Sequence, residues 1–363
     1  MVNFRYFISK KNNEIDEYHD LWNGFIPEDR KNRTTSSESI TYGTFFKGAE
    51  NFLTKNIEKI PNININDHDN IFIFLDKHGK FYHPARIEIP KKNENICFVL
   101  NTAVNETGKM CMKYEIESLT ELNKKNLDYV PNIYFHGDVV SEESELSMFC
   151  GNWFENYCEF HISPFEDSQK IIVWDPSENY YLSFDEEIEV YRQCSKIMTE
   201  YYDERSFSQI SPWHHAAGDF ILKKDNGIDV KLITVRQFAP FAEVDEPDEN
   251  TVLYGLLYFM INLSIRMRLD RIDGVDKTVW ADEHAMDGFF KGFFEALTLK
   301  KPVIEGNSSL KECFIEYIQN VSYEDLDGMG CDLVSSYNEN SPEIPLIEMN
   351  LEKHIKNIYT FLK

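Results

Sequence analysis

Positive charge is scarce in this chain of 363 residues. Its 37 Lys and Arg residues stand against 62 Asp and Glu residues, so the formal net charge at pH 7 is -25. A surface with this charge repels the phosphate backbone of nucleic acids and anionic lipid, unless a local basic patch offsets it. The densest basic pairs, Lys10-Lys11 and Lys300-Lys301, are too short to form such a patch. We therefore expect neither nucleic acid nor a membrane among the partners.

Long hydrophobic runs are also missing. The longest, Val252 to Ile265, is interrupted by Gly255, Asn262 and Ser264, and it is shorter than the roughly 20 apolar residues that span a bilayer. The opening Met-Val-Asn-Phe-Arg-Tyr lacks the apolar stretch and the small-residue cleavage site of a secretory signal. The sequence thus predicts neither a membrane span nor export.

Paired cysteines are absent as well, because the seven cysteines are scattered without a CxxC motif. An odd and dispersed set is typical of reduced thiols packed as small apolar residues in a cytoplasm. We therefore expect a cytoplasmic protein. With 42% hydrophobic and 14% aromatic residues, the chain is long enough for two lobes that each bury a core.

The order of apolar patterns predicts an α+β protein with four segments. Residues 1–65 form an N-terminal extension with one helix near 45–60, and residues 66–150 form a small antiparallel β lobe. In that lobe the patterns predict three strands, one helix and two strands, near 71–75, 81–89, 96–100, 110–125, 132–136 and 146–150. Residues 151–165 form an aromatic interlobe linker, and residues 166–363 form a larger helical lobe.

The helical lobe begins with an amphipathic helix near 188–201, for which Ser183 and Glu186 predict a capping box. A hairpin follows, because two apolar runs flank a polar turn that contains Asn226-Gly227. Residues 252–267 are apolar nearly all round, which predicts a buried central helix. Further helices are expected near 286–299, 310–318 and 349–362.

This order of elements resembles the protein kinase-like fold, and more closely its small-molecule branch, the aminoglycoside and choline phosphotransferases. The resemblance covers roughly residues 70–300. It implies two lobes around a shared cleft and, for an active member, a strand lysine, a helix glutamate, a catalytic aspartate and two metal-binding residues that position ATP and Mg²⁺.

Several of these implied positions are replaced in the small lobe. Asn101 stands near the place of the strand lysine and brings no positive charge, while Lys113 lies within the predicted helix. Glu115 or Glu117 matches the helix glutamate, with solvated helix carboxylates as the simpler interpretation. The segment from His78 to Pro84 matches the phosphate-covering loop but has a single glycine.

The catalytic loop is also altered. In the phosphotransferases this loop usually reads His-Gly-Asp, four residues, Asn and Ile-Leu. If Ile221-Leu222 is aligned with its end and no gap is allowed, His215 takes the place of the catalytic aspartate and Phe220 that of the metal-binding asparagine. Aligned with a shift, Asp219 becomes the base, since a carboxylate accepts a hydroxyl proton or binds magnesium. Thr234 takes the place of the second aspartate, which leaves two-magnesium catalysis without a ligand.

Three further groups of residues have competing interpretations. His214, His215 and Asp219 are catalytic residues, ligands of a transition metal, or buried hydrogen-bonded groups, and we assign no metal to them. Arg236, Arg266 and Arg268 bind an anionic group together, or the last two form ion pairs within their helix. Trp153 and the aromatic residues after it stack on a flat ring in the cleft, or they simply pack.

Two hypotheses follow from these observations. The preferred one is a pseudokinase-like module that binds a nucleotide, a small anionic ligand or a protein partner in the interlobe cleft. The alternative is an atypical phosphotransferase, or another transferase, that acts on a small molecule with Asp219 or His215 as base and with the arginines stabilising charge. The cofactor stays open, with ATP and Mg²⁺ as candidates.

Overall fold

The computed structural model describes residues 2–8, 13–27, 39–60, 63–64, 69–75, 78–79, 81–91, 95–213, 218–274, 277–302 and 309–363. Over these residues the protein is α+β, with eight α-helices and both parallel and antiparallel strand pairs, as the sequence predicts for the class. The chain divides into two compact units, Met1–Glu155 and Asn156–Lys363, which we call the first unit and the second unit.

No helix in the described ranges is both long enough and apolar enough to cross a membrane.

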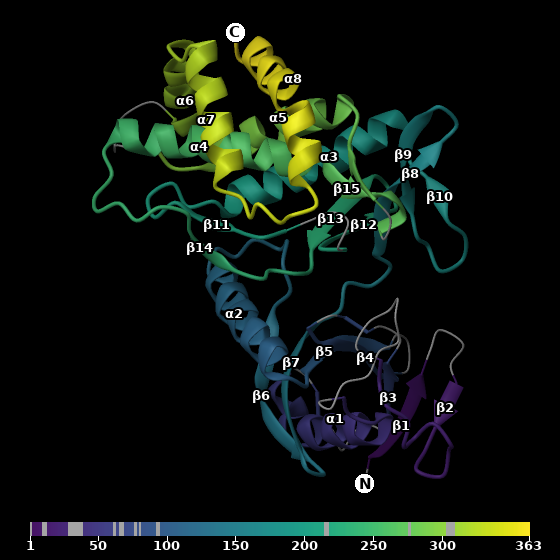
Figure 1. Ribbon diagram of the computed structural model, residues 1–363. Helices are drawn as coiled ribbons and strands as arrows, with labels where there is room; N and C mark the ends of the chain where they lie inside the picture. Colours follow the sequence, from purple (N-terminus) through teal and green to yellow (C-terminus); the bar gives the residue numbers. More distant parts are fainter. Residues whose placement is uncertain are drawn as a thin grey trace. The chain divides into compact units, whose positions relative to one another are not determined.

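The first unit is built on one seven-stranded sheet with the strand order β2-β1-β3-β4-β5-β7-β6 (Figure 1). Strands β1 and β3 are parallel, and the other neighbours are antiparallel. The elements are β1 (Asn3–Ile8), β2 (Asn13–Ile15), α1 (Tyr42–Asn56), the 3-10 helix η1 (Ile57–Lys59), β3 (Asn70–Leu75), β4 (His83–Ile89), β5 (Ile96–Ala103), α2 (Glu106–Asn123), β6 (Ile133–Ser141) and β7 (Ser144–Asn152).

The predicted run of three strands, one helix and two strands is confirmed as β3, β4, β5, α2, β6 and β7. The segment expected as an extension differs from that expectation, because it is part of the same sheet and core. Strand β1 pairs with β3 along its whole length, from Asn3 opposite Asn70 to Ile8 opposite Leu75. Helix α1 shares one hydrophobic core with the sheet.

The two faces of this sheet differ because side chains alternate along each strand. Phe45, Phe46 and Phe52 of α1 pack in one core with Ile73 and Leu100 of the sheet. We call the opposite face the second face; it carries half-buried side chains of β3, β4 and β5, namely Phe72, Arg86, Val99 and Asn101. Helix α2 packs on part of that face, where its Met112 joins Ala103 and Phe149.

The second unit contains a five-stranded antiparallel sheet with the order β10-β9-β8-β12-β13, two short ribbons and six of the described helices. The strands are β8 (Cys158–Phe165), β9 (Ser168–Val173), β10 (Tyr180–Tyr181), β11 (Ser208–Ile210), β12 (Phe220–Lys224), β13 (Ile228–Leu232), β14 (Phe238–Pro240), β15 (Leu269–Arg271) and β16 (Thr278–Trp280). The helices are α3 (Phe184–Tyr201), α4 (Glu249–Met267), the 3-10 helix η4 (Ile272–Gly274), α5 (His284–Leu299), α6 (Leu310–Gln319), α7 (Tyr323–Ser335) and α8 (Ile344–Leu362).

The predicted linker at 151–165 also differs from the structure, in which most of it is strand. Strand β7 continues to Asn152, and β8 starts at Cys158. Cys158 and the run from Phe160 to Ser163 are buried, so both faces of this strand are covered through its middle. The connection between β7 and β8 is therefore only the short segment from Trp153 to Tyr157.

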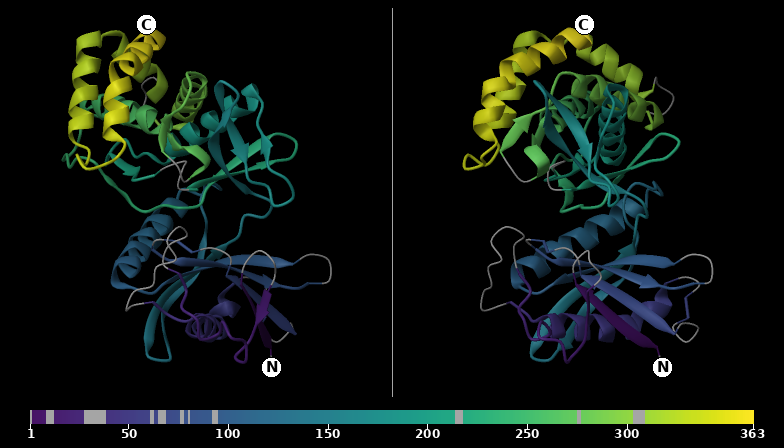
Figure 2. Two further views of the ribbon diagram at one scale, coloured as in Figure 1. Left: turned by 45° about the vertical axis from the view of Figure 1, so that its right-hand side comes forward. Right: turned by 90° about the vertical axis from the view of Figure 1, so that its right-hand side faces the viewer.

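Helices α3, α4, α5 and α6 lie where the sequence patterns predict them, whereas α8 begins five residues before its predicted start and α7 was not predicted. Helix α3 begins at the predicted capping box, in which the Ser183 backbone N–H donates to the Glu186 carboxylate at 2.9 Å. Helix α4 is buried on most sides and lies beside α5, α6 and α7. Figure 2 shows α6, α7 and α8 standing together next to it. One central apolar helix thus organises the helical part of this unit.

His354 joins α8 to α4 in the interior of the second unit. Its ring is almost fully buried, and its Nε2 lies 2.9 Å from the Ser264 hydroxyl. Burial, with a smaller contribution from the positive charge of Arg268, lowers the pKa of His354 to about 3. The imidazole is therefore neutral at pH 7.

This lowered pKa predicts a pH dependence of stability. Between pH 6.5 and 3 the unfolded chain binds a proton at His354 that the folded chain does not, so its stabilising contribution is complete above pH 6.5 and is lost as the pH falls. We expect the free energy of unfolding to fall by up to ~1.4 kcal/mol per pH unit through this group. In urea titrations between pH 4.5 and 7.5, His354→Asn should flatten the slope, whereas His136→Asn, at an exposed position of β6, should leave it unchanged.

Candidate functional site

Asp219, the sequence-predicted base, directly precedes β12, and its carboxylate is completely buried. Both of its oxygens accept hydrogen bonds from Arg236: Nη1 lies 2.6 Å from Oδ2 and Nη2 lies 2.7 Å from Oδ1. Arg236 Nη1 also donates to the carbonyl of Pro212 at 3.1 Å. This two-pronged pairing is a strong, geometrically specific interaction. The pair of Asp219 and Arg236 thus links the segment that precedes β12 to the segment that follows β13.

The hairpin that carries Asp219 is formed as predicted. Strands β12 and β13 pair from Phe220 opposite Leu232 to Lys224 opposite Ile228. The backbone N–H of Ile233 donates to the carbonyl of Asp219 at 2.8 Å, which extends the ladder to the site itself. His214 and His215, the other two candidate catalytic residues, lie outside the described residues.

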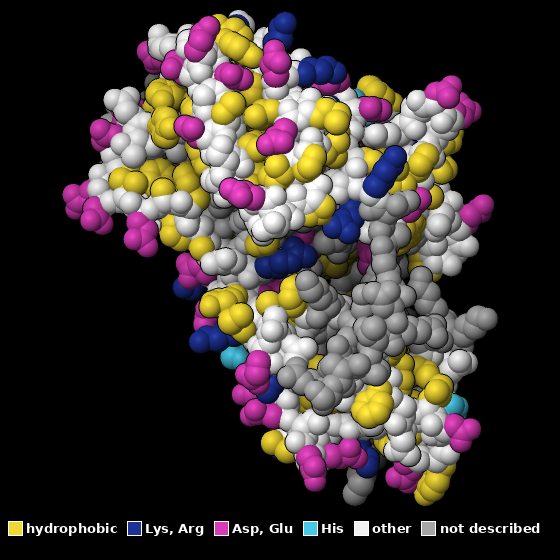
Figure 3. Space-filling model, in the orientation of Figure 1, with side chains coloured by type: hydrophobic (Ala, Val, Ile, Leu, Met, Phe, Trp, Pro, Cys, Tyr) yellow, Lys and Arg dark blue, Asp and Glu magenta, His cyan; other side chains and the backbone are white. Residues whose placement is uncertain are grey.

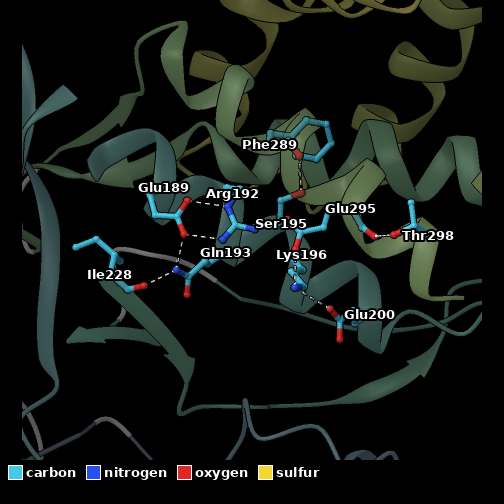
Figure 4. A network of polar contacts seen from close by, with 10 residues as sticks. All are labelled: Glu189, Arg192, Gln193, Ser195, Lys196, Glu200, Ile228, Phe289, Glu295 and Thr298. Atoms are coloured by element: carbon cyan, nitrogen blue, oxygen red, sulfur yellow. Dashed lines mark hydrogen bonds and ion pairs between the residues drawn. The ribbon is translucent and has the colours of Figure 1, made fainter. Parts of the chain in front are cut away.

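A polar network on α3 holds this hairpin in place (Figure 4). The Gln193 amide donates to the carbonyl of Ile228 at 2.6 Å and accepts from the N–H of Val230 at 2.9 Å. On the same helix, Arg192 forms an ion pair with Glu189 at 2.6 Å and a second with Glu295 of α5. Gln193 of α3 thus satisfies two backbone groups on the outer edge of β13.

Asn101 and Glu115 are the residues that the sequence resemblance put in place of the lysine and glutamate pair of a kinase. Asn101 is half-buried on β5, opposite Phe149 of β7. Glu115 is almost fully buried on α2, and the Tyr82 hydroxyl donates a hydrogen bond to its carboxylate. A phenol at this carboxylate and an amide at the strand position bring no positive charge for a phosphate group.

Arg266 and Arg268 at the end of α4 have structural partners. Arg266 Nη1 lies 2.8 Å from the buried carboxylate of Glu343. Arg268 donates from Nε to the carbonyl of Ala281 at 2.7 Å and from Nη1 to Glu283 at 3.0 Å. With Arg236 on Asp219, the three guanidinium groups are bound to three different carboxylates. The structure therefore brings none of them to a common anion, and the partners of the last two come from outside their own helix.

The partner of Arg268 has an altered ionisation. Burial alone would raise the pKa of Glu283, but hydrogen bonds from Arg268 and Lys353 lower it to about 2. Asn357 of α8 also donates to this carboxylate at 2.8 Å. Glu283 thus stays ionised at neutral pH and ties the start of α5 to α8.

Trp153 directly follows β7 in the first unit, and 39% of its surface is exposed. An exposed indole offers a flat apolar face that another ring can stack on. His161, farther along the predicted linker, is by contrast buried in β8, with its ring 4.6 Å from that of Trp174. Of these two residues of the predicted linker, Trp153 is thus open to a ligand and His161 is packed in the interior.

Sequence reasoning missed a buried polar cluster in the second unit. Glu187 of α3 accepts from the backbone N–H of Ile171 at 2.7 Å and pairs with His284 at 2.9 Å. Asp270 accepts from the N–H of Ile162 at 2.9 Å. A signal for Glu187 was present, because this charge lies on the apolar stripe of its helix, four residues before the buried Tyr191.

Metal-binding groups do not assemble in the described ranges, which contain no cluster of three or more His, Cys, Asp or Glu side chains arranged to hold an ion. Neither the models of protein families nor the curated proteins gave a match to this chain. The functional argument therefore depends on the geometry of the residues themselves.

Proposed function

We propose that this chain is a pseudokinase-like binding module, in which a kinase-like order of elements is retained without phosphotransfer chemistry. Its ligand is a nucleotide, or a molecule with a similar flat ring, bound independently of metal at the first unit. The support for the fold is the order β3, β4, β5, α2, β6 and β7, whose five strands belong to one sheet, followed by the hairpin β12–β13 and the buried helix α4.

The observation that carries this proposal is the state of Asp219. A general base must reach the proton that it removes, by direct contact or through one water molecule. Asp219 is fully buried, and both of its oxygens are bound to Arg236 at 2.6 and 2.7 Å. This carboxylate is thus engaged as half of an internal ion pair, which favours a binding module over a transferase.

Magnesium does not fit the residues at the corresponding positions. Asp219 is bound to Arg236, and Thr234 replaces the second carboxylate. A hydroxyl is a weaker ligand for Mg²⁺ than the carboxylates that usually bind it. Stabilisation by a nucleotide should therefore be the same with Mg²⁺ and with a chelator.

The second face of the first unit's sheet is the ligand surface in this proposal. Val99 and Asn101 are half-buried neighbours on that face of β5, and Trp153 is exposed just after β7. An apolar side chain, an amide and an indole suit a heterocyclic ring, which needs apolar contact and a few hydrogen bonds. Because Asn101 stands where a lysine is expected, the phosphates of a nucleotide should contribute little to its affinity.

Thermal shift and calorimetric titrations of the full chain test this function. ATP, ADP and adenosine should each raise the melting temperature, because a ligand that binds only the folded state stabilises it. Val99→Glu should reduce the affinity at least tenfold, and Trp153→Ala should weaken it. Val140→Glu, at an exposed position of β6 in the same unit, is the matched control and should bind as the wild type does.

Two results would contradict the proposal. The first is the absence of any shift with these three compounds. The second is a shift that requires Mg²⁺ together with release of ADP, which would support the atypical phosphotransferase with Asp219 or His215 as base.

A further inference from the structure

The second unit contains a groove that is not part of the proposed nucleotide surface. One wall is the ribbon β15–β16 with Arg271 and Lys277, and the other is the start of α8 with Pro345, Leu346 and Met349. Its volume is about 490 Å³, within the ~300–1,000 Å³ of cavities that hold drug-sized ligands. Thr278 and Pro342 also line it.

The charged side chains that line the groove in the described part of the chain are two cations, Arg271 and Lys277, on a protein of net charge -25. Arg271 and Lys277 are both exposed and line the groove from the two sides of the ribbon's connection. The buried carboxylates nearby are already engaged, because Asp270 accepts from the N–H of Ile162 at 2.9 Å and Glu343 pairs with Arg266 at 2.8 Å. Local cations on an acidic surface concentrate an anionic partner at that place.

The helix wall is apolar and exposed. Met349 has 80% of its surface accessible, and Pro342 and Pro345 are exposed as well. Figure 3 shows that hydrophobic side chains lie between scattered acidic ones over the face with the C-terminal helices. Methionine adapts its shape to different partners, while a proline ring loses little conformational entropy on binding.

We infer that this groove binds an acidic and apolar peptide segment of a partner protein, with its carboxylates on Arg271 and Lys277 and its apolar side chains against Pro345, Leu346 and Met349. Charge complementarity argues for the acids. The exposure of both walls argues for a peptide, since small-molecule sites bury ~70–90% of their ligand. This inference is independent of the proposed nucleotide binding.

A peptide array tests it. The probes are fluorescein-labelled peptides whose six-residue cores combine two Asp or Glu with three Leu, Phe or Met, and matched peptides with Asn or Gln at the acidic positions. The full-length protein should bind the acidic set in preference to the amide set. Loss of a charged hydrogen bond reduces affinity by roughly tenfold to a hundredfold, so Arg271→Glu should reduce the affinity for the best acidic peptides at least tenfold.

Two further variants make the result specific. Met349→Glu changes a side chain that is 80% exposed, so it should leave the fold intact and still weaken binding at least tenfold. Lys291→Glu reverses an exposed charge on α5, outside the groove, and should change affinity less than twofold. Equal binding of the acidic and amide sets, or an equal effect of Arg271→Glu and Lys291→Glu, would overturn the inference.

Discussion

Replacing Arg236 by methionine is expected to lower the melting temperature of the second unit by roughly 6–20 °C. The substitution leaves the carboxylate of Asp219, which is fully buried, without the guanidinium that binds both of its oxygens. Removing one partner of a buried ion pair costs about 3–5 kcal/mol, because the remaining charge has lost both water and its partner. For units of about 150–250 residues, each kcal/mol corresponds to ~2–4 °C.

The double variant Asp219→Asn with Arg236→Met separates a buried charge from a lost contact. Asparagine carries no charge, so the double variant should be more stable than Arg236→Met alone. Lys291→Met is the control, since Lys291 is exposed on α5. Differential scanning calorimetry of the four proteins measures the effect.

An unchanged melting temperature for Arg236→Met would have a functional meaning. It would indicate that Asp219 does not depend on Arg236 and is available to another group. In that case the atypical transferase would regain its base, and Asp219→Asn should be tested for loss of turnover.

The sequence predicts local elements well where apolar patterns have one clear period. The first strand of the predicted small lobe was expected near 71–75 and is Asn70–Leu75. The helix expected near 110–125 is Glu106–Asn123, and its start was placed too late because its first turn contains few apolar residues. The N-cap Asn105, whose side chain accepts from the N–H of Gly108 at 2.8 Å, was the missed signal.

Pairings between distant segments could not be predicted in the same way. Strand β1 gains its place in the sheet from a parallel partner more than 60 residues later, Asn3 opposite Asn70. Parallel pairing leaves no turn signal in the sequence, since its connection is long. The segment 1–65 therefore reads as an extension until the partner of β1 is known.

The sequence predicts the hairpin beside Asp219 but not the residue that pairs with Asp219. The hairpin register places Phe220 opposite Leu232, so Asp219 necessarily lies near the residues after β13, including Arg236. Which residue would neutralise Asp219 does not follow from the pattern, because a carboxylate at a hairpin mouth looks the same whether it serves chemistry or packing. The carboxylates that bind Arg266 and Arg268 likewise come from later elements.

The substitution Gly292→Ala is also expected to lower the stability of the second unit strongly, because α3 and α5 pack closely at this glycine. A Cβ atom at Gly292 of α5 would lie 2.9 Å from the backbone nitrogen of Lys196 in α3, and closer still to the carbonyl oxygen of Arg192. Gly288, one turn earlier, has the same kind of contact, with the backbone nitrogen of Arg192 at 2.9 Å. At both glycines the obstacle is backbone, which cannot rotate away as a side chain can.

Gly292→Ala should therefore force α3 and α5 apart. The separation would strain the ion pairs of Glu295 with Arg192 and Lys196, and the Gln193 contacts that hold β13 to α3 (Figure 4). Overpacking typically costs ~1–3 kcal/mol, so at ~2–4 °C per kcal/mol we expect the melting temperature to fall by ~2–12 °C.

Gly328→Ala in α7 is the matched control with the opposite expected sign. A Cβ atom at Gly328 meets no other atom within 4 Å. Alanine is favoured over glycine inside a helix by ~1 kcal/mol, so the same substitution should raise the melting temperature there by ~2–4 °C. Equal shifts for the two variants would mean that α3 and α5 do not approach each other through these glycines, and α3 would then no longer explain how the hairpin with Asp219 is held.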